Sequence, residues 1–348
     1  MKKVYEAIQK ASNAALIVGA GISYDMGIPL GYQFPMQFGE THQSLLNRLD
    51  ILKEWQTAWS AADSRKWELE EQFVQVLIRE FKFSMDLQQA LLDWLMSYQS
   101  SSGSHAGEPV FMGQSSDVHA AFVIAWLKRI FKHLVTTNWD FLLEWHVDTI
   151  YQESYADPFE PATYTFDNGL TCAIDSNRLF FLESLEGDDY FWTPRWDIVA
   201  NVSDLPNLKR WTRPIWKIHG SPFFLACPRC GGFSRWKRTT AVKVNDPCPE
   251  HPHEKLLPEI VFWGQGIDQA HPQVWSRVKA RLERSDLIIA SGFSGSGSDV
   301  YIRNAVERHP NAWVINPSRG AWDVSRVNYV EAKASELVDL LLTQFVTK

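Results

Sequence analysis

A short apolar segment that ends in a glycine turn constrains the fold of this chain more than any other feature. Leu16-Ile17-Val18 is typical of a buried strand, and Gly19-Ala20-Gly21 follows it directly. Apolar residues at helical spacing within residues 4–15 predict a short amphipathic helix before this strand. A helix, a buried strand and a glycine-rich turn in this order indicate one edge of an α/β sheet that binds a ligand.

Further short apolar segments alternate with helical segments along the chain. Residues 41–100 are predicted to be largely helical, and Asp117 is a candidate cap for a helix over residues 118–132. This alternation is typical of an α/β fold with a Rossmann-like, doubly wound parallel sheet. The other predicted strands are 134–137, 216–219, 260–263, 287–290 and 312–315, and the other predicted helices are 300–307 and 335–345.

Length and composition narrow the class of protein. At roughly 150 residues per domain, a chain of 348 residues holds two domains or one large domain with a smaller one. The 34 Lys and Arg against 41 Asp and Glu leave a net charge of −7, which argues against a nucleic-acid-binding protein with a broadly basic surface. No apolar run reaches the length of about 18 residues that a membrane span needs. With no secretory leader and four cysteines, we expect a reducing, cytoplasmic compartment and no membrane partner.

The same patterns divide the chain into parts. We expect a Rossmann-like domain, a helical module, a small cysteine-containing module and an insert whose structure the sequence does not indicate. These parts are residues 1–40, 117–150 and 256–348 for the Rossmann-like domain, 41–116 for the helical module, 222–255 for the cysteine module and 151–212 for the insert.

The turn from Gly19 to Ser23 is the first candidate binding element. Glycines without Cβ atoms let backbone N–H groups approach a pyrophosphate, so Gly19, Ala20, Gly21 and Ser23 are candidate contacts. The segment lacks the third glycine of a GxGxxG motif, and an ordinary strand-to-helix turn is the equal alternative.

Polar residues at two other strand ends are the candidate catalytic groups. Asn138 and Asp140 follow the strand at 134–137, where parallel sheets bind ligands. The amide of Asn138 suits a water or a ribose hydroxyl, and Asp140 can accept from an amide. His219 stands at the end of the strand at 216–219, next to a glycine, and could act as a general base near neutral pH. Taken singly, Asn138 and Asp140 could instead cap a helix, and most single histidines are not catalytic.

A second turn of small residues, 292–300, follows the strand at 287–290. Small residues and hydroxyls beside a helix start make Gly292 and Ser294 candidate contacts to an anion or a ribose. Asn316 ends the next strand and adds a polar group at the same edge of the sheet. An ordinary strand-to-helix turn is the alternative here too.

Two cysteine hooks form the most specific local motif. Cys227 with Cys230, and Cys248 with His251, each place two ligands at the spacing of a tetrahedral zinc site, and 17 residues separate the hooks. Three thiolates and one imidazole make a closed site, so we expect a structural Zn²⁺ that takes no part in chemistry. His253 is the alternative fourth ligand.

In this order, the motifs resemble the sirtuin family. His119, ahead of the helix that leads to Thr136–Asp140, fits the same pattern, and the resemblance covers residues 12–40, 117–145 and 215–345. It rests on GAGIS with Gly27-Ile28-Pro29, TTNWD at 136–140, His219-Gly220, the cysteine hooks, LPEIVFWGQ at 257–265, the Gly/Ser turn and VINP at 314–317.

The resemblance implies an NAD-binding Rossmann-like domain with a zinc module, and cleavage of the nicotinamide–ribose bond of NAD. Asn138, Asp140 and His219 match the residues that matter most for this chemistry in the family. Other implied contacts are Gly19, Ala20 and Gly21 with the phosphates, Thr137 and Ser294 with riboses and phosphates, Asn316 with the adenosine ribose, and Val261 and Phe262 with an acyl-lysine channel.

The chain departs from the family pattern mostly around the acceptor channel. Leu30-Gly31-Tyr32 stands where sirtuins usually read DFR, and Gln265 replaces an acidic residue. Thr137 replaces a glutamine, and His251 replaces the fourth zinc cysteine. Because these changes spare most NAD groups, cleavage of NAD is the safer prediction.

Three functions remain open, and we rank an NAD-dependent lysine deacylase first. In it the acyl oxygen attacks C1′ of the ribose, His219 takes a proton from a ribose hydroxyl, and Asn138 orders the ribose and a water. The alternative is an NAD hydrolase of the bacterial defence type, which the missing DFR, the inserts and the turn ending at Asp299 resemble. The third is a non-catalytic NAD or ADP-ribose sensor, against which Asn138 and His219 together argue. The acyl group, the protein target and the oligomeric state stay open.

Overall fold

The computed structural model describes the α/β domain, most of a helical module and parts of the connecting segments. The described residues are 1–23, 34–46, 48–61, 63, 65–100, 117–139, 142–143, 146, 162–165, 171–174, 215–226, 246–248, 251–255, 257–261, 266–270, 272–295 and 299–346.

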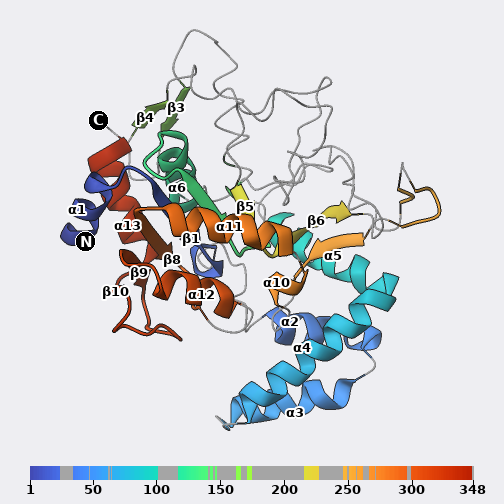
Figure 1. The fold of residues 1–348 in the computed structure, drawn as a ribbon. Coiled ribbons are helices and arrows are strands. Elements are labelled where there is room, and N and C mark those ends of the chain that lie inside the picture. Colours follow the sequence, from blue (N-terminus) through green and yellow to red (C-terminus); the bar gives the residue numbers. More distant parts are fainter. Residues whose placement is uncertain are drawn as a thin grey trace.

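A six-stranded, wholly parallel sheet forms the centre of the molecule (Figure 1). Counted in chain order, its strands lie as 3-2-1-4-5-6, which is the order of the Rossmann fold, so the predicted fold class is confirmed. From one edge to the other the strands are β5 (Ile215–Lys217), β2 (His133–Thr136), β1 (Ala14–Val18), β8 (Leu287–Ser291), β9 (Ala312–Asn316) and β10 (Asn328–Glu331).

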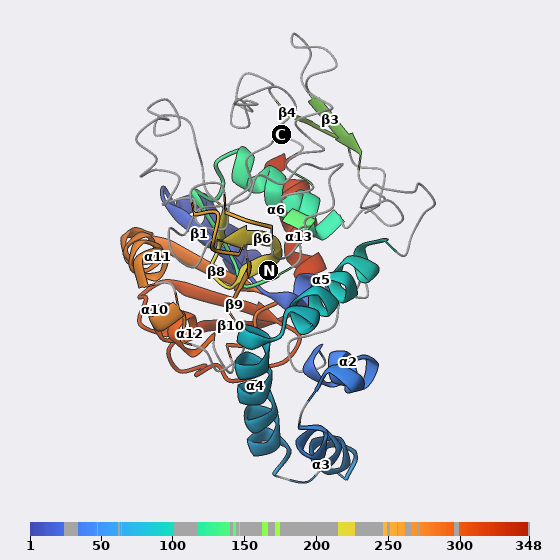
Figure 2. The ribbon, with the colours of Figure 1, turned by 90° about the vertical axis from the view of Figure 1, so that its right-hand side faces the viewer.

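Side chains alternate between the two faces of the sheet, and each face is covered by its own helices. Leu16 and Val18 of β1 pack into one core with α1, α6 and α13, while Ala15 and Ile17 pack into the other with α11 and α12. Figures 1 and 2 show these two layers of helices on opposite sides of the sheet. The covering helices are α1 (Lys2–Lys10), α6 (Asp117–Leu127) and α13 (Ala334–Leu341) on one face, and α10 (Ile267–Ala270), α11 (Pro272–Arg284) and α12 (Val300–Glu307) on the other.

The helical module expected over 41–116 contains long helices that extend away from the sheet (Figure 2). Trp55 and Phe73 form part of its core, with ring centroids 5.5 Å apart. The helix α5 contacts a small antiparallel hairpin of β6 (Gly220–Ala226) and β7 (Leu257–Ile260). The helices within the expected range are α3 (Leu49–Ser60), α4 (Lys66–Phe83) and α5 (Met85–Ser100), with a short 3-10 turn η3 (Gln43–Leu45), and a further helix, α2 (Phe34–Thr41), precedes them.

Some predicted boundaries were wrong. The helix expected over 118–132 ends at Leu127, because the chain turns there and Arg129 takes a positive φ of 65°. The strand expected over 260–263 is β7, which ends at Ile260 and pairs with β6 outside the main sheet. The patterns did not indicate α11 or the edge strand β10.

Of the predicted insert at 151–212, the structure describes one antiparallel hairpin. Its strands are β3 (Ala162–Thr165) and β4 (Thr171–Ile174). The remaining short turns are η1 (Ala20–Ile22), a 3-10 turn after β1, and η6 (Leu342–Val346), a π-helical turn after α13. Among the described helices, none combines the length and apolar character that a membrane span requires.

Candidate active site at the carboxyl edge of the sheet

Most of the predicted NAD-site residues that the structure describes lie at the carboxyl edge of the sheet, around the point between β1 and β8 where strand order reverses. Sheets of this kind bind ligands in the crevice beyond the carboxyl ends of the two strands at such a point. The turn after β1 carries Gly19–Ser23 and the turn after β8 carries Gly292–Gly295. The ends of β2 and β5 lie beside them and carry Asn138 and His219.

The two glycine turns are packed directly against each other. The N–H of Gly19 donates to the carbonyl of Ser291 at 3.1 Å, and the N–H of Gly21 donates to the carbonyl of Gly292 at 2.9 Å. A Cβ on Gly19 would lie 2.6 Å from the Gly292 oxygen, and Gly292 itself has a φ of +62°. Close contact between turns therefore requires these glycines. Both N–H groups donate within the fold, and the expected contact of this turn with a pyrophosphate stays a prediction.

Asn138 is held by a buried polar chain that crosses from β2 to α6. Its Nδ2 donates to the hydroxyl of Ser23 at 2.9 Å, and that hydroxyl lies 3.0 Å from Nε2 of His119. Ser23 and His119 are fully buried, and Asn138 is 3% exposed. His146 stacks on His119 with ring centroids 6.3 Å apart, and burial together with the charge of His119 lowers the pKa of His146 to about 3. These contacts orient the Asn138 amide from its Nδ2 side only.

The backbone of Asn138 is fixed from the other side. Its N–H donates to the hydroxyl of Thr136 at 3.0 Å, and its carbonyl accepts from Nζ of Lys217 at 2.8 Å. Lys217 ends β5 and is 3% exposed, so a buried ammonium joins the two strand ends. With Nδ2 on Ser23, the Oδ1 of Asn138 is buried and has no hydrogen-bond partner within the described parts of the chain.

His219 lies in the turn after β5 and is 6% exposed. It forms a hydrogen bond with the backbone of Thr137, the residue that precedes Asn138. Burial and the nearby charge of Lys217 lower its pKa to about 4, against the raising effect of that hydrogen bond. His219 is therefore neutral near pH 7, the state in which an imidazole can accept a proton.

Asp299 faces His219 from the start of α12. Its Oδ1 lies 3.2 Å from Nε2 of His219, but the two atoms are not aligned as a hydrogen bond. The side chain of Asp299 is 16% exposed, and burial raises the pKa of its carboxyl to about 8. An acid and a base thus meet at the carboxyl edge of the sheet.

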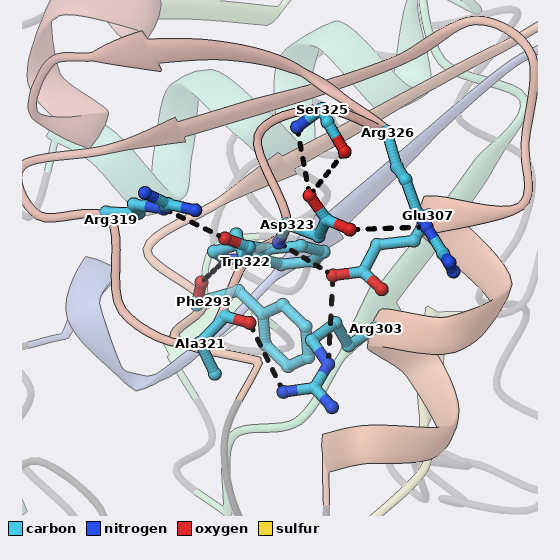
Figure 3. Close-up of polar contacts among 9 residues, drawn as sticks. All are labelled: Phe293, Arg303, Glu307, Arg319, Ala321, Trp322, Asp323, Ser325 and Arg326. Atoms are coloured by element: carbon cyan, nitrogen blue, oxygen red, sulfur yellow. Dashed lines mark hydrogen bonds and ion pairs between the residues drawn. The ribbon is translucent and has the colours of Figure 1, made fainter.

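A second loop braces the turn after β8, as Figure 3 shows. The carbonyl of Phe293 accepts from the indole N–H of Trp322 at 2.9 Å and from Nδ2 of Asn316 at 2.6 Å. Oδ1 of Asn316 accepts from the N–H of Phe293 at 3.2 Å. Arg303 of α12 donates to the carbonyl of Ala321 at 3.3 Å. The amide of Asn316 is thus used inside the protein, and in this structure it supports the turn.

The second cysteine hook is compact. The Sγ of Cys248 lies 4.0 Å from Nδ1 of His251, and the N–H of Cys248 donates to the carbonyl of Glu254 at 3.0 Å. Cys248 is buried, whereas His253 is exposed. Ligands about 2.3 and 2.1 Å from a tetrahedral zinc lie about 3.6 Å apart, so Cys248 and His251 fit two adjacent corners of such a site. The described residues contain no group of three or more metal-ligating side chains.

Several predicted site residues lie outside the described part of the chain. They are Asp140, Cys227, Cys230 and Phe262. Ser294 is exposed in the turn after β8, and Val261 is buried, its N–H donating to the carbonyl of His219 at 2.9 Å.

Sequence reasoning did not single out Lys217 or Ser291. Ser291 ends β8, is fully buried, and its Oγ has no hydrogen-bond partner in the described residues. Ser291 directly follows the predicted strand 287–290, and that position was the signal that could have found it, whereas Lys217 lies inside the predicted strand 216–219 and ends β5 only in the structure.

Solved structures of Sir2 homologues share the whole fold of this chain. A Sir2 homologue in complex with NAD superposes with a TM-score of 0.51 at 17% identity, over 99% of this chain and 93% of that one. A mutant Sir2 homologue in complex with ADP-ribose gives 0.53 at 17%, over 99% and 95%. Another, in complex with 2'-O-acetyl ADP-ribose, gives 0.52 at 18%, over 99% and 95%. No protein-family model and no curated protein matches the sequence.

Proposed function

We propose, from the fold that it shares with Sir2 homologues, that this protein is a Sir2-type enzyme that cleaves the nicotinamide–ribose bond of NAD. Its first proposed activity is NAD-dependent lysine deacylation, in which the acyl group passes to ADP-ribose. The described residues at the carboxyl edge of the sheet support binding of a polar, hydroxyl-bearing ligand.

The observation that most directly supports this function is a set of buried polar atoms without hydrogen-bond partners among the described residues. Oδ1 of Asn138, Nε2 of His219 and Oγ of Ser291 come from three strands of the sheet and share its carboxyl edge. An unsatisfied buried polar atom costs about 1–3 kcal/mol, so three of them together are typical of a site that a ligand completes. The Sir2 homologues with this fold hold NAD, ADP-ribose or 2'-O-acetyl ADP-ribose.

The described side chains suit the chemistry of this reaction. Departure of nicotinamide leaves positive charge on C1′ of the ribose, and a neutral His219 adds none to it. The Oδ1 of Asn138 can accept a hydrogen bond from a ribose hydroxyl or a water, while Ser23 holds the other half of its amide. Nε2 of His219 can take the proton of a ribose hydroxyl. We propose that Asp140 holds the carboxamide of nicotinamide.

Deacylation needs an acceptor channel beside His219. We propose that Val261 and Phe262 line it, and the position of Val261 supports this, because its backbone N–H donates to the carbonyl of His219. The complex with 2'-O-acetyl ADP-ribose shows that a protein of this fold binds an acylated ADP-ribose.

Hydrolysis of NAD is the second candidate activity, and one observation favours it. Asp299 lies 3.2 Å from Nε2 of His219, so a carboxyl group stands beside the imidazole. A carboxyl beside an imidazole suits the activation of water as the acceptor in place of the acyl oxygen.

One experiment separates these activities. The protein is incubated with NAD, with and without an acetyl-lysine peptide, and the products are identified by mass spectrometry. Peptide-dependent acyl-ADP-ribose supports deacylation, and ADP-ribose formed without peptide supports hydrolysis. Binding of NAD with no release of nicotinamide in either reaction would contradict the proposed enzyme and favour a sensor. His219→Ala should abolish turnover while it leaves binding of NAD largely intact.

We also propose a structural zinc ion bound by Cys227, Cys230, Cys248 and His251. The compact hook of Cys248 and His251 supports it. Its sulfur and imidazole nitrogen are 4.0 Å apart and need to move by only a few tenths of an ångström to reach the separation of about 3.6 Å that two ligands of a tetrahedral zinc have. When bound, such an ion would cross-link the module and do no chemistry. The exposure of His253 favours His251 as the fourth ligand.

A further inference from the structure

Asp299 occupies a position at which an aspartate usually caps a helix, but its side chain does not cap α12. It is the N-cap residue of α12, a position at which the carboxylate usually accepts a hydrogen bond from the first turn of the helix. The Asp299 side chain forms no such bond. Its Oδ1 instead faces Nε2 of His219 at 3.2 Å, from a segment 80 positions away in the sequence.

The orientation of the imidazole leaves one nitrogen for chemistry. His219 donates to the backbone of Thr137, and Nε2 has no hydrogen-bond partner within the described residues. Nδ1 is therefore the nitrogen that donates, and Nε2 carries the lone pair. Because Nε2 and Oδ1 are close but not aligned, the lone pair of Nε2 stays open to a hydroxyl of a bound substrate.

The surroundings disfavour a positive charge on His219 unless a negative charge balances it. Lys217 of β5 is a buried cation whose charge lowers the pKa of His219, and burial lowers it further. The carbonyl of Thr137, from the end of β2, acts in the opposite direction. From α12, Asp299 is the described acid that contacts the ring, and the amino end of that helix favours its ionised form while burial disfavours it.

We propose that Asp299 is a positioning residue that acts through His219. It keeps Nε2 of the imidazole at the carboxyl edge of the sheet and balances the imidazolium charge when His219 takes a proton. The proposal rests on the NAD-cleaving function, and it deepens that function for either acceptor.

The proton balance of this step is simple. The O–H bond of a ribose hydroxyl breaks, an N–H bond forms at Nε2, and the electron pair stays on the ribose oxygen. Above about pH 8, where Asp299 is ionised, the new proton lies against its charged Oδ1, so the pair passes from one negative charge to neutral. The reverse transfer returns the proton to the leaving group or to water, and no oxidant or further reactant is needed.

The first test does not depend on activity. In protein labelled with ¹⁵N-histidine, the His219 signals are assigned by their loss in His219→Gln, and their titration is compared between the wild type and Asp299→Asn. A charge that forms 3.2 Å from Nε2 perturbs the imidazole, so we expect the wild-type His219 signals to show an inflection near pH 8, where Asp299 ionises, and we expect this inflection to be absent in Asp299→Asn. Asp50→Asn, which removes a carboxylate that is 68% exposed, is the matched control and should leave the titration unchanged. Identical His219 curves in the wild type and Asp299→Asn overturn the proposal.

The second test measures release of nicotinamide above pH 8, where Asp299 is ionised. We expect Asp299→Asn to lower kcat by at least about tenfold, within the roughly 10²–10⁴-fold that a general base contributes, and to change KM for NAD by less than about threefold. Asp299→Glu should restore part of kcat, because it restores the charge. Equal kcat in the wild type and Asp299→Asn contradicts the proposal. If the wild type releases no nicotinamide, the NAD-cleaving function fails, and the titration of His219 still decides the role of Asp299.

Discussion

The amide of Asn138 donates to the hydroxyl of Ser23 at 2.9 Å, although 115 positions separate the two residues. The bond joins the turn after β1 to the end of β2, and it continues through Ser23 to His119 on α6. It occupies the nitrogen of the amide and leaves the oxygen at the carboxyl edge of the sheet. The orientation of one candidate catalytic side chain therefore depends on a residue of the glycine turn.

This relationship predicts different effects for two substitutions. Ser23→Ala removes the acceptor of the Asn138 amide, so it should lower the rate of nicotinamide release by about tenfold, the equivalent of one hydrogen bond of about 1–1.5 kcal/mol. Asn138→Ala removes the oxygen as well and should lower the rate by at least about 100-fold. Ser60→Ala removes an exposed hydroxyl on α3 and serves as the control. Equal rates for Ser23→Ala and the wild type would show that the bond does not orient the amide.

Gly19→Ala tests whether contact between the two turns requires glycine. The added Cβ would lie 2.6 Å from the carbonyl oxygen of Gly292, and backbone cannot move as a side chain can. We expect a loss of about 1–3 kcal/mol in the free energy of unfolding, measured by urea denaturation. Gly266→Ala is the matched control, because its Cβ would meet only side-chain atoms of Asp268 and Tyr301, and it should cost less. A smaller loss in Gly19→Ala than in Gly266→Ala would contradict this account.

Acid should destabilise the protein through His146. Its pKa is lowered from 6.5 to about 3 in the folded state, so below pH 6.5 the unfolded state binds a proton that the folded state does not. Its contribution to stability is complete above pH 6.5 and falls by about 1.4 kcal/mol per pH unit toward pH 3. His219, with its pKa lowered to about 4, also makes the folded state less stable as the pH falls to about 4. Asp299, with its pKa raised to about 8, makes the folded state more stable as the pH falls below 8.

The measurement is the free energy of unfolding at several pH values between 6.5 and 4. In His146→Gln the slope against pH should be smaller than in the wild type by about 1.4 kcal/mol per unit. The exposed His253→Gln is the control. The same slope in His146→Gln and the wild type would exclude a buried, neutral His146.

The zinc module can be tested by metal analysis. Cys248→Ser and His251→Ala should each lose bound zinc and lower the melting temperature, since ligand binding and folding of such a module are coupled. His253→Ala should retain one zinc per chain, because His253 is exposed while His251 lies 4.0 Å from Cys248. Loss of zinc in His253→Ala with retention in His251→Ala would assign the fourth ligand to His253.

Much of the fold followed from local patterns. The apolar segment at 16–18 and its counterparts in β2, β8 and β9 were identified because a strand buried on both faces reads as a short continuous apolar run. Edges were harder. The strand β10 has mostly partly exposed or exposed residues, so it lacks such a run, and the end of α6 depends on the positive φ of Arg129 and not on a loss of apolar residues.

The sequence indicated residues of the candidate site more readily than it indicated what each of them contacts. Asn138 and His219 were indicated because they follow strands, and parallel strands bring their carboxyl ends to one edge. The uses of Gly19, Gly21 and Asn316 inside the protein were not predictable, because each depends on the turn after β8, more than 200 positions from the glycines.

By itself, the sequence determined which central segments become strands and which polar residues follow them, because burial and period are local properties of a chain. Only the tertiary structure decided that Ser23 takes half of the Asn138 amide, that Lys217 fixes its backbone, and that Asp299 faces His219. These contacts join distant segments, and the charge state of each group follows from the burial and the neighbours that such contacts create.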